Sequence, residues 1–165
     1  MVIKKIVKPS GEAVYKLYNM AIVYTNFSGE RFNDGKRSFD ILLDDGDVEY
    51  FKKEGFFLSP FKFERKDGIK YHLNIKLKFD GKRPPHMYMY NNKVKVVINA
   101  TNAGLLDAAD IVSADAAIHP NEYSPGVASA WLEEFRAVIE EEYFADEYAK
   151  YDDIPEDDNG ADLPF

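Results

Sequence analysis

The residues best suited to chemistry in this sequence are cations interleaved with aromatic rings between residues 31 and 95. The clearest stretch is 70–79, where the odd positions from 71 onward are apolar and Lys70, Lys76 and Lys78 lie at even positions. Strict alternation predicts a strand with these cations on one face. Cations beside flat rings suit a single-stranded nucleic acid, because cations follow the phosphates while rings stack on exposed bases.

Neighbouring predicted strands and loops add to this set. Tyr88 and Tyr90 share one face of a predicted strand, and Phe61 and Phe63 share one face of another. The alternative for each ring is core packing, which is the commonest role of a large aromatic residue. The predicted DNA contacts are Arg37, Lys62, Phe61, Phe63, Lys70, Lys76, Lys78, Arg83, Tyr88, Tyr90, Lys93 and Lys95.

Charge is segregated along the chain. Residues 1–100 contain 19 Lys and Arg against 12 Asp and Glu, whereas residues 101–165 contain 2 against 17. The net charge of −8 therefore conceals a body of +7 and a following part of −15. This asymmetry favours a basic body that binds an anionic partner; the alternative is an acidic tail that only aids solubility.

The last residues combine an acidic, flexible composition with an apolar tip. Few core residues occur from residue 152 onward, so we expect a folded domain of residues 1–151 and a disordered tail of residues 152–165. Phe165 suits insertion into a pocket while the free carboxylate meets a cation at its rim, unless the apolar tip is a chance ending. The predicted partner-binding residues are Asp157, Asp158, Asp162, Leu163, Pro164 and Phe165.

Motifs of the common enzyme classes are missing from the sequence. It contains no P-loop, no Gly-rich dinucleotide turn and no nucleophile elbow. Cysteine is absent and the three histidines lack the spacing of metal ligands. Asp107, Asp110 and Asp115 fit turn and capping roles better than metal binding. We therefore expect no enzyme, no cofactor and no metal ion.

Short strands separated by turn residues dominate the predicted secondary structure. Many such strands favour a small barrel or sandwich over a helical fold. Pro60 indicates an edge or bulged strand. The predicted strands cover residues 14–27, 37–43, 56–65, 70–79, 86–90, 93–98 and 111–118, with a short turn or helix at 105–110.

Two further segments have helical character. Residues 47–54 predict a helix with Asp47 as N-cap and Gly55 as its stop, and residues 141–151 predict a second helix. The segment 128–139 is ambiguous between helix and strand, because Trp131, Phe135 and Ile139 share one face in either.

Two stretches carry a resemblance to known families. The end of the chain, Asp162-Leu163-Pro164-Phe165, resembles the acidic tip of bacterial single-stranded DNA-binding proteins, in which Ile usually stands where Leu163 does. The body resembles a family of phage replication-module proteins regarded as OB-fold single-stranded DNA-binding proteins. The matching residues are 26–29, 32–33, 36–39, 84–85, 87–88, 106–107, 109–111, 138–142, 144–145 and 148–149.

The resemblance implies a mainly β fold: an OB-like five-stranded barrel with additional strands and one or two short helices. It also implies a strand at residues 128–139 and non-catalytic binding of single-stranded DNA in phage replication or recombination. The acidic tail would recruit phage or host replication and recombination proteins. No apolar run is long enough for a bilayer and no signal peptide is expected, which favours the cytoplasm of an infected bacterium.

Three other functions stay open at this level. The barrel would serve as a scaffold in a structural or assembly protein of a virion. It would bind RNA in an RNA-binding or RNA-silencing factor, because contacts to the 2′-hydroxyl cannot be recognised in a sequence. A metal-dependent nuclease fits the sequence least well. A homodimer is also left open.

Overall fold

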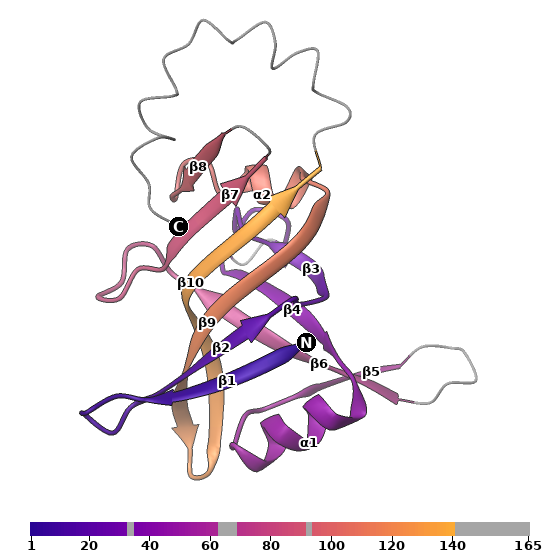
Figure 1. Ribbon diagram of the computed structural model, residues 1–165, viewed down its shortest axis with the longest axis vertical. Helices are drawn as coiled ribbons and strands as arrows, with labels where there is room; N and C mark the ends of the chain where they lie inside the picture. The colour runs from indigo at the N-terminus through magenta and orange to yellow at the C-terminus, as the bar shows by residue number, and fades with distance from the viewer. Residues whose placement is uncertain (33–34, 63–68, 92–93, 141–165) are drawn as a thin grey trace, which may run out of the picture.

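Ten strands and two helices form the described part of the chain, which comprises residues 1–32, 35–62, 69–91 and 94–140. This computed structural model gives only the backbone of residues 61, 62 and 69. The predicted mainly β class is confirmed. In chain order the elements are β1 (Val2–Val7), β2 (Ala13–Tyr18), β3 (Ile22–Asn26), β4 (Arg37–Leu43), α1 (Asp45–Lys53), β5 (Ser59–Lys62), β6 (Ile69–Leu77), β7 (His86–Tyr90), β8 (Lys95–Ile98), α2 (Gly104–Ala108), β9 (Ile111–Ser124) and β10 (Val127–Ile139) (Figure 1).

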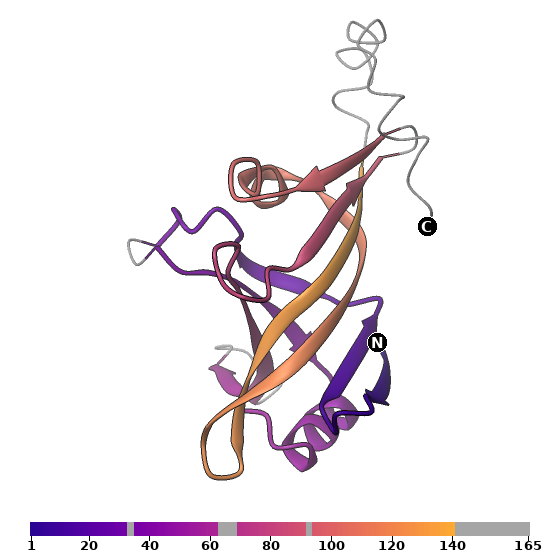
Figure 2. The same ribbon diagram turned by 90° about the vertical axis from the view of Figure 1, so that its left-hand side faces the viewer.

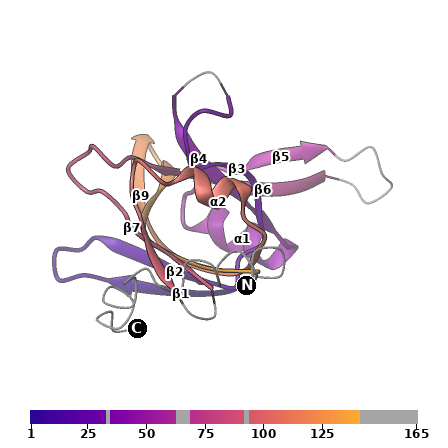
Figure 3. The same ribbon diagram turned by 90° about the horizontal axis from the view of Figure 1, so that it is seen from above.

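All ten strands belong to one sheet with β10 near its centre. The order is β1-β2-β9-β10-β6-β4-β3, with β5 added on β6 and with β7 between β10 and β8. Seen from above, the strands curl into an incomplete ring, and α1 and α2 lie at its two ends (Figures 1 and 3). Within the described residues no pairing joins β1 to β3. The OB-like arrangement is therefore confirmed, and its sheet is not closed.

The strand β10 pairs with three other strands, β9, β6 and β7. It forms a long antiparallel hairpin with β9, which spans most of the molecule's length (Figure 2). On its other edge it pairs in parallel with β6 at residues 130–131 and then with β7 at residues 134–138. Consequently β6 and β7 follow one another along the same edge of β10.

Three phenylalanine rings form the centre of the core. Phe27, Phe39 and Phe135 are fully buried, and their ring centroids lie 5.1 to 5.4 Å apart. Full burial of one such side chain contributes about 1.5–3 kcal/mol. Because strand side chains alternate, burying these inner residues turns their neighbours outward and so determines the outer face of the sheet.

Several predicted boundaries are wrong for local reasons. The predicted strand 14–27 is divided into β2 and β3, because Asn19 between them adopts a left-handed φ of 62° that is incompatible with an extended strand. The predicted strand 56–65 begins only at Ser59, and Pro60 lies in an edge strand as expected. The edge strand β1 was missed because its exposure does not alternate regularly. The ambiguous segment 128–139 is a strand, β10, as the resemblance implied. The helix expected at residues 141–151 lies outside the described residues.

The helix α1 begins earlier than predicted, with Asp44 rather than Asp47 as its N-cap. The Asp44 carboxylate accepts a hydrogen bond of 2.8 Å from the Asp47 backbone nitrogen, which would otherwise lack a helical partner. We expect Asp44→Ala to lower the free energy of unfolding by about 0.5–2 kcal/mol. Urea unfolding measures this, with Glu49→Ala, an exposed change in the same helix, as the control. An equal effect of both substitutions would contradict the capping role.

Candidate functional site

The outer face of β6 carries the predicted row of cations. Leu73, Ile75 and Leu77 are buried, whereas Lys70 and Lys78 are exposed and Lys76 is partly exposed. The predicted alternation is therefore confirmed, although β6 ends at Leu77 and Lys78 directly follows it. Within the described residues neither Lys76 nor Lys78 forms an ion pair, so both ammonium groups are available to an anion.

A groove of about 640 Å³ lies where these cations meet β10. Its four cations come from β6, β4 and the residues beside them, and the rings of Phe79 and Trp131 also line it. The mixture of several cations with one acidic residue makes the groove electropositive. The lining residues are Gly35, Lys36, Arg37, Lys76, Leu77, Lys78, Phe79, Asp80, Ala100 and Trp131.

Trp131 lies in this groove because of an irregularity in β10. In the parallel pairing of β10 with β6, Trp131 is the direct neighbour of Lys76. A register shift between Leu132 and Glu134 reverses the alternation, so Phe135 is buried while Trp131 stays partly exposed. The expectation that these two residues share a face is therefore wrong. The sequence contains no signal for the bulge, which is why Trp131 was not among the predicted contacts.

Arg37 forms part of the groove wall, and its guanidinium is already bound to other groups of the protein. Its guanidinium donates hydrogen bonds to the backbone carbonyls of Phe27 (2.8 Å) and Ala100 (3.2 Å). It also lies 5.0 Å from the centroid of the Phe79 ring. These contacts connect β4 with two loops and fix one side of the groove, so Arg37 has a structural role whether or not it contacts a ligand.

A buried polar network divides the cations of β6 into two groups. Asp40 of β4 is only 6% exposed, accepts a hydrogen bond of 2.6 Å from Asn74 and contacts Nδ1 of His72. Because His72 and Asn74 occupy the face between Lys70 and Lys76, Lys70 is separated from the groove. The structure thus brings Arg37, Lys76 and Lys78 together and leaves Lys70 apart from them.

The predicted aromatic pair on β7 forms a second cluster farther along β10. Tyr88 and Tyr90 are both partly buried on one face, and the Lys95 ammonium lies 4.2 and 5.8 Å from their ring centroids. Burial, and then the charge of Arg136, lower the pKa of Lys95. Burial also raises the pKa of Tyr90. This cation–aromatic cluster lies beside residues 134–138 of β10, whereas the groove lies beside Trp131.

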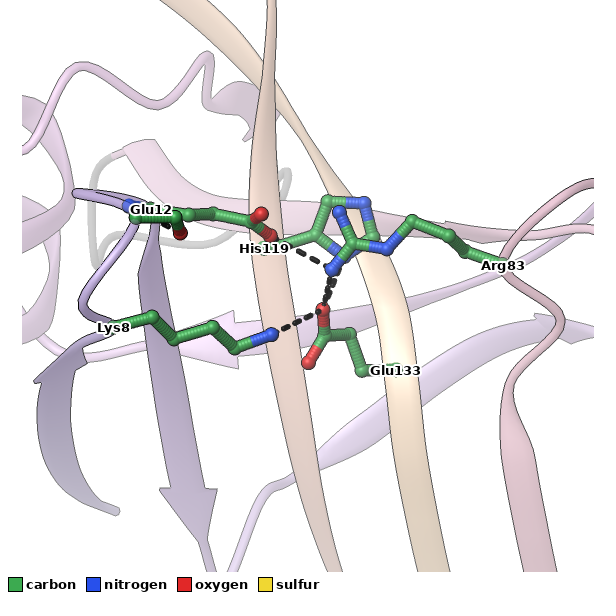
Figure 4. Close-up of polar contacts among 6 residues, drawn as sticks. Lys8, Glu12, Arg83, His119 and Glu133 are labelled. Carbon is green, nitrogen blue, oxygen red and sulfur yellow. Dashed lines mark hydrogen bonds and ion pairs between the residues drawn. The ribbon is translucent and has the colours of Figure 1, made fainter.

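Arg83 already has two carboxylate partners. Its guanidinium contacts Glu133 and lies 2.7 Å from Glu12, as Figure 4 shows. Lys8 and His119 belong to the same cluster, with His119 Nδ1 3.2 Å from Glu133. Burial, and then the charge of Arg83, lower the pKa of His119. An anion would have to compete with two glutamates for Arg83, which weakens its prediction as a DNA contact.

The remaining predicted site residues have no described side chains. Phe61 and Lys62 lie in β5, where the backbone of Phe61 is paired with that of Lys70. Phe63, Lys93 and the six partner-binding residues of the tail lie outside the described part of the chain. By contrast, two of the aspartates predicted to have turn and capping roles bind backbone nitrogens of segments that are distant in the sequence. Asp107 accepts hydrogen bonds from the backbone nitrogens of Phe27 and Ser28, and Asp115 accepts one from Asn19.

Comparison with known proteins gives a likeness of fold. No protein-family model matches the chain, and no curated protein matches its sequence. Among solved structures, a C-terminal truncation of the single-stranded DNA-binding protein from bacteriophage Enc34 is similar, with a TM-score of 0.50 and 14% identity over 85% of this chain and 92% of that one. The untruncated protein from the same phage gives 0.48 and 14% over 83% and 86%. Its complex with single-stranded DNA gives 0.49 and 14% over 85% and 93%.

The first of these similarities shows the fold expected from the family resemblance. None of the helices in the described ranges is long and apolar enough to cross a membrane.

Proposed function

We propose that this protein binds single-stranded DNA, without sequence preference and without catalysis, along the outer face of β6, β10 and β7. The observation that carries the proposal is the groove that Lys76 and Lys78 line together with Trp131. A base stacks on the indole ring while the two ammonium groups contact phosphates on either side of it. Such contacts do not distinguish one base from another, because every base has a flat face.

The cation–aromatic cluster of Tyr88, Tyr90 and Lys95 extends the same path. It lies along the same edge of β10, about five residues beyond Trp131. At about 3.3 Å per residue this separation is roughly 16 Å, a distance that a few nucleotides span. We infer that the bound DNA strand runs from the groove past Arg136 toward β7. Binding should therefore strengthen as the oligonucleotide becomes long enough to reach both places.

The likeness to a phage protein whose structures are described as single-stranded DNA-binding supports the same function. The setting that fits it is phage DNA replication or recombination in the cytoplasm of the bacterial host. In this setting the acidic tail, residues 152–165, recruits replication or recombination proteins through Leu163 and Phe165.

A mobility-shift titration tests the proposed function. We expect poly-dT to be retarded by the full chain at low salt and a duplex of equal length to be retarded far less. A matched RNA strand tests the sugar, because discrimination against RNA requires contacts at the 2′ position. The absence of any retardation of poly-dT at low salt would rule out the function and favour a scaffold role in the virion.

Deleting residues 152–165 should tighten binding of a long oligonucleotide at low salt. The deleted segment carries six acidic residues and no lysine or arginine, so it competes with phosphate for the cationic groove. The gain should shrink as salt rises, because mobile ions screen exposed charges. Fluorescence anisotropy of a labelled oligonucleotide measures both effects. Unchanged or weaker binding after truncation would contradict competition by the tail.

A further inference from the structure

Five side chains from separate segments meet on the outer face beside the groove (Figure 4). Lys8 and Glu12 come from the turn between β1 and β2, and Arg83 comes from the loop before β7. His119 lies on β9 and Glu133 on β10. Trp131 is paired with His119 across these two strands, so the cluster adjoins the proposed DNA path.

Three of these residues are a donor set for a metal ion. Glu12, His119 and Glu133 each offer one ligand atom, and these atoms all lie within 4.8 Å of one another. Zinc binds imidazole nitrogen and carboxylate oxygen at about 2.0–2.2 Å in a tetrahedral arrangement, so two of its ligand atoms lie about 3.4 Å apart. Both glutamate side chains are partly exposed, which leaves them free to rotate toward this spacing.

The imidazole of His119 is placed as a ligand would be. Its side chain is 13% exposed, and its Nδ1 atom is shielded from solvent. Although Nδ1 lies 3.2 Å from the Glu133 carboxylate, it has no aligned hydrogen bond within the described residues. Buried polar atoms without a hydrogen bond are uncommon, and a missing ion is one of their explanations.

A cation already lies between the two carboxylates. The Arg83 guanidinium contacts Glu12 and Glu133 from the position that a metal ion would share with them. A hollow of about 370 Å³ adjoins the cluster and is lined by Lys82, Arg83 and Pro84, among others. It offers the guanidinium room to move away when another cation takes its place.

We propose that Glu12, His119 and Glu133 bind one divalent transition-metal ion, with Zn²⁺ as the occupant, and that the ion displaces Arg83 from the two carboxylates. An imidazole nitrogen in the set favours Zn²⁺ over Mg²⁺ and Ca²⁺, which prefer oxygen ligands. This site lies beside the DNA groove without sharing its lining residues, and zinc binding goes beyond the proposed function.

Calorimetric titration of Zn²⁺ into the full chain, prepared without a histidine tag and without DNA, tests the proposal. We expect one Zn²⁺ ion to bind per chain, with a higher affinity than that of the other carboxylates. Glu12→Gln should weaken this site by at least about tenfold, as should His119→Gln. Arg83→Gln should tighten it about fivefold, because the competing cation has been removed. Mg²⁺ should give background heat alone.

Glu122→Gln is the matched control, because Glu122 is an exposed carboxylate on the β9–β10 hairpin outside the cluster. It should leave the Zn²⁺ isotherm unchanged. Glu12 lies in a turn and is partly exposed, so Glu12→Gln keeps the test valid even if His119→Gln fails to fold. Identical isotherms for the wild type and Glu12→Gln, or weaker binding by Arg83→Gln, would overturn the proposal and leave an ion-pair cluster. Because DNA is absent, neither result depends on the proposed function.

Discussion

Replacing Trp131 with alanine should weaken binding of a dT oligonucleotide by roughly 5- to 150-fold, the loss expected when one stacked base loses its aromatic partner. Trp131 is partly exposed in the groove and lies beside Lys76. In the proposed complex a base stacks on the indole ring, and the lysines contact the phosphates of the neighbouring nucleotides. Fluorescence anisotropy at fixed salt measures the change. Trp131→Phe should retain most of the affinity, because it keeps an aromatic face.

Tyr123→Ala is the control for this substitution. Tyr123 is 60% exposed near the end of β9 and does not line the groove, so its loss should leave affinity unchanged. Trp131 is also the single tryptophan of the chain, and its emission should therefore change on DNA binding. If Trp131→Ala binds as tightly as the wild type while remaining folded in urea titrations, the groove is not the path of the DNA.

The double substitution Lys76→Ala, Lys78→Ala should lower the salt dependence of binding as well as the affinity. Each phosphate contact on a single strand contributes about 0.7 to the slope of log Kobs against log salt concentration, so two lost contacts should reduce its magnitude by about 1.4. The comparison needs titrations at four or more salt concentrations. It separates the loss of phosphate contacts from a general loss of binding, which would weaken affinity without changing the slope.

A double substitution of equal charge change provides the control. Lys4 on β1 and Lys53 on α1 are exposed and outside the groove, so Lys4→Ala, Lys53→Ala removes the same net charge. It should leave the slope close to that of the wild type. Equal slopes for the two double variants would show that net charge, rather than the groove, determines the salt dependence.

Two acidic residues lie between the groove and the cation–aromatic cluster of Tyr88, Tyr90 and Lys95. Glu133 and Glu134 lie between Trp131 and Tyr88, yet each is matched by an arginine, Arg83 and Arg136 respectively. The Arg136–Glu134 pair has a separation of 2.6 Å at the exposed surface. Pairing of this kind lowers the repulsion that a phosphate would meet between the groove and the second cluster.

Local pattern was sufficient to predict the mainly β class, the strand at 37–43 and the outward row of cations on β6. These features follow from interactions between residues near in sequence, because the side-chain period of a strand is two. The opposed charges of the two parts of the chain were likewise visible without a structure.

The tertiary structure alone decided which of these residues act together. The bulge in β10 turns Trp131 into the groove, backbone carbonyls hold Arg37, and two glutamates hold Arg83. Each outcome depends on how segments pack against one another in the folded chain. A shift of one residue exchanges the two faces of a strand, so no pattern within a single segment contains this information.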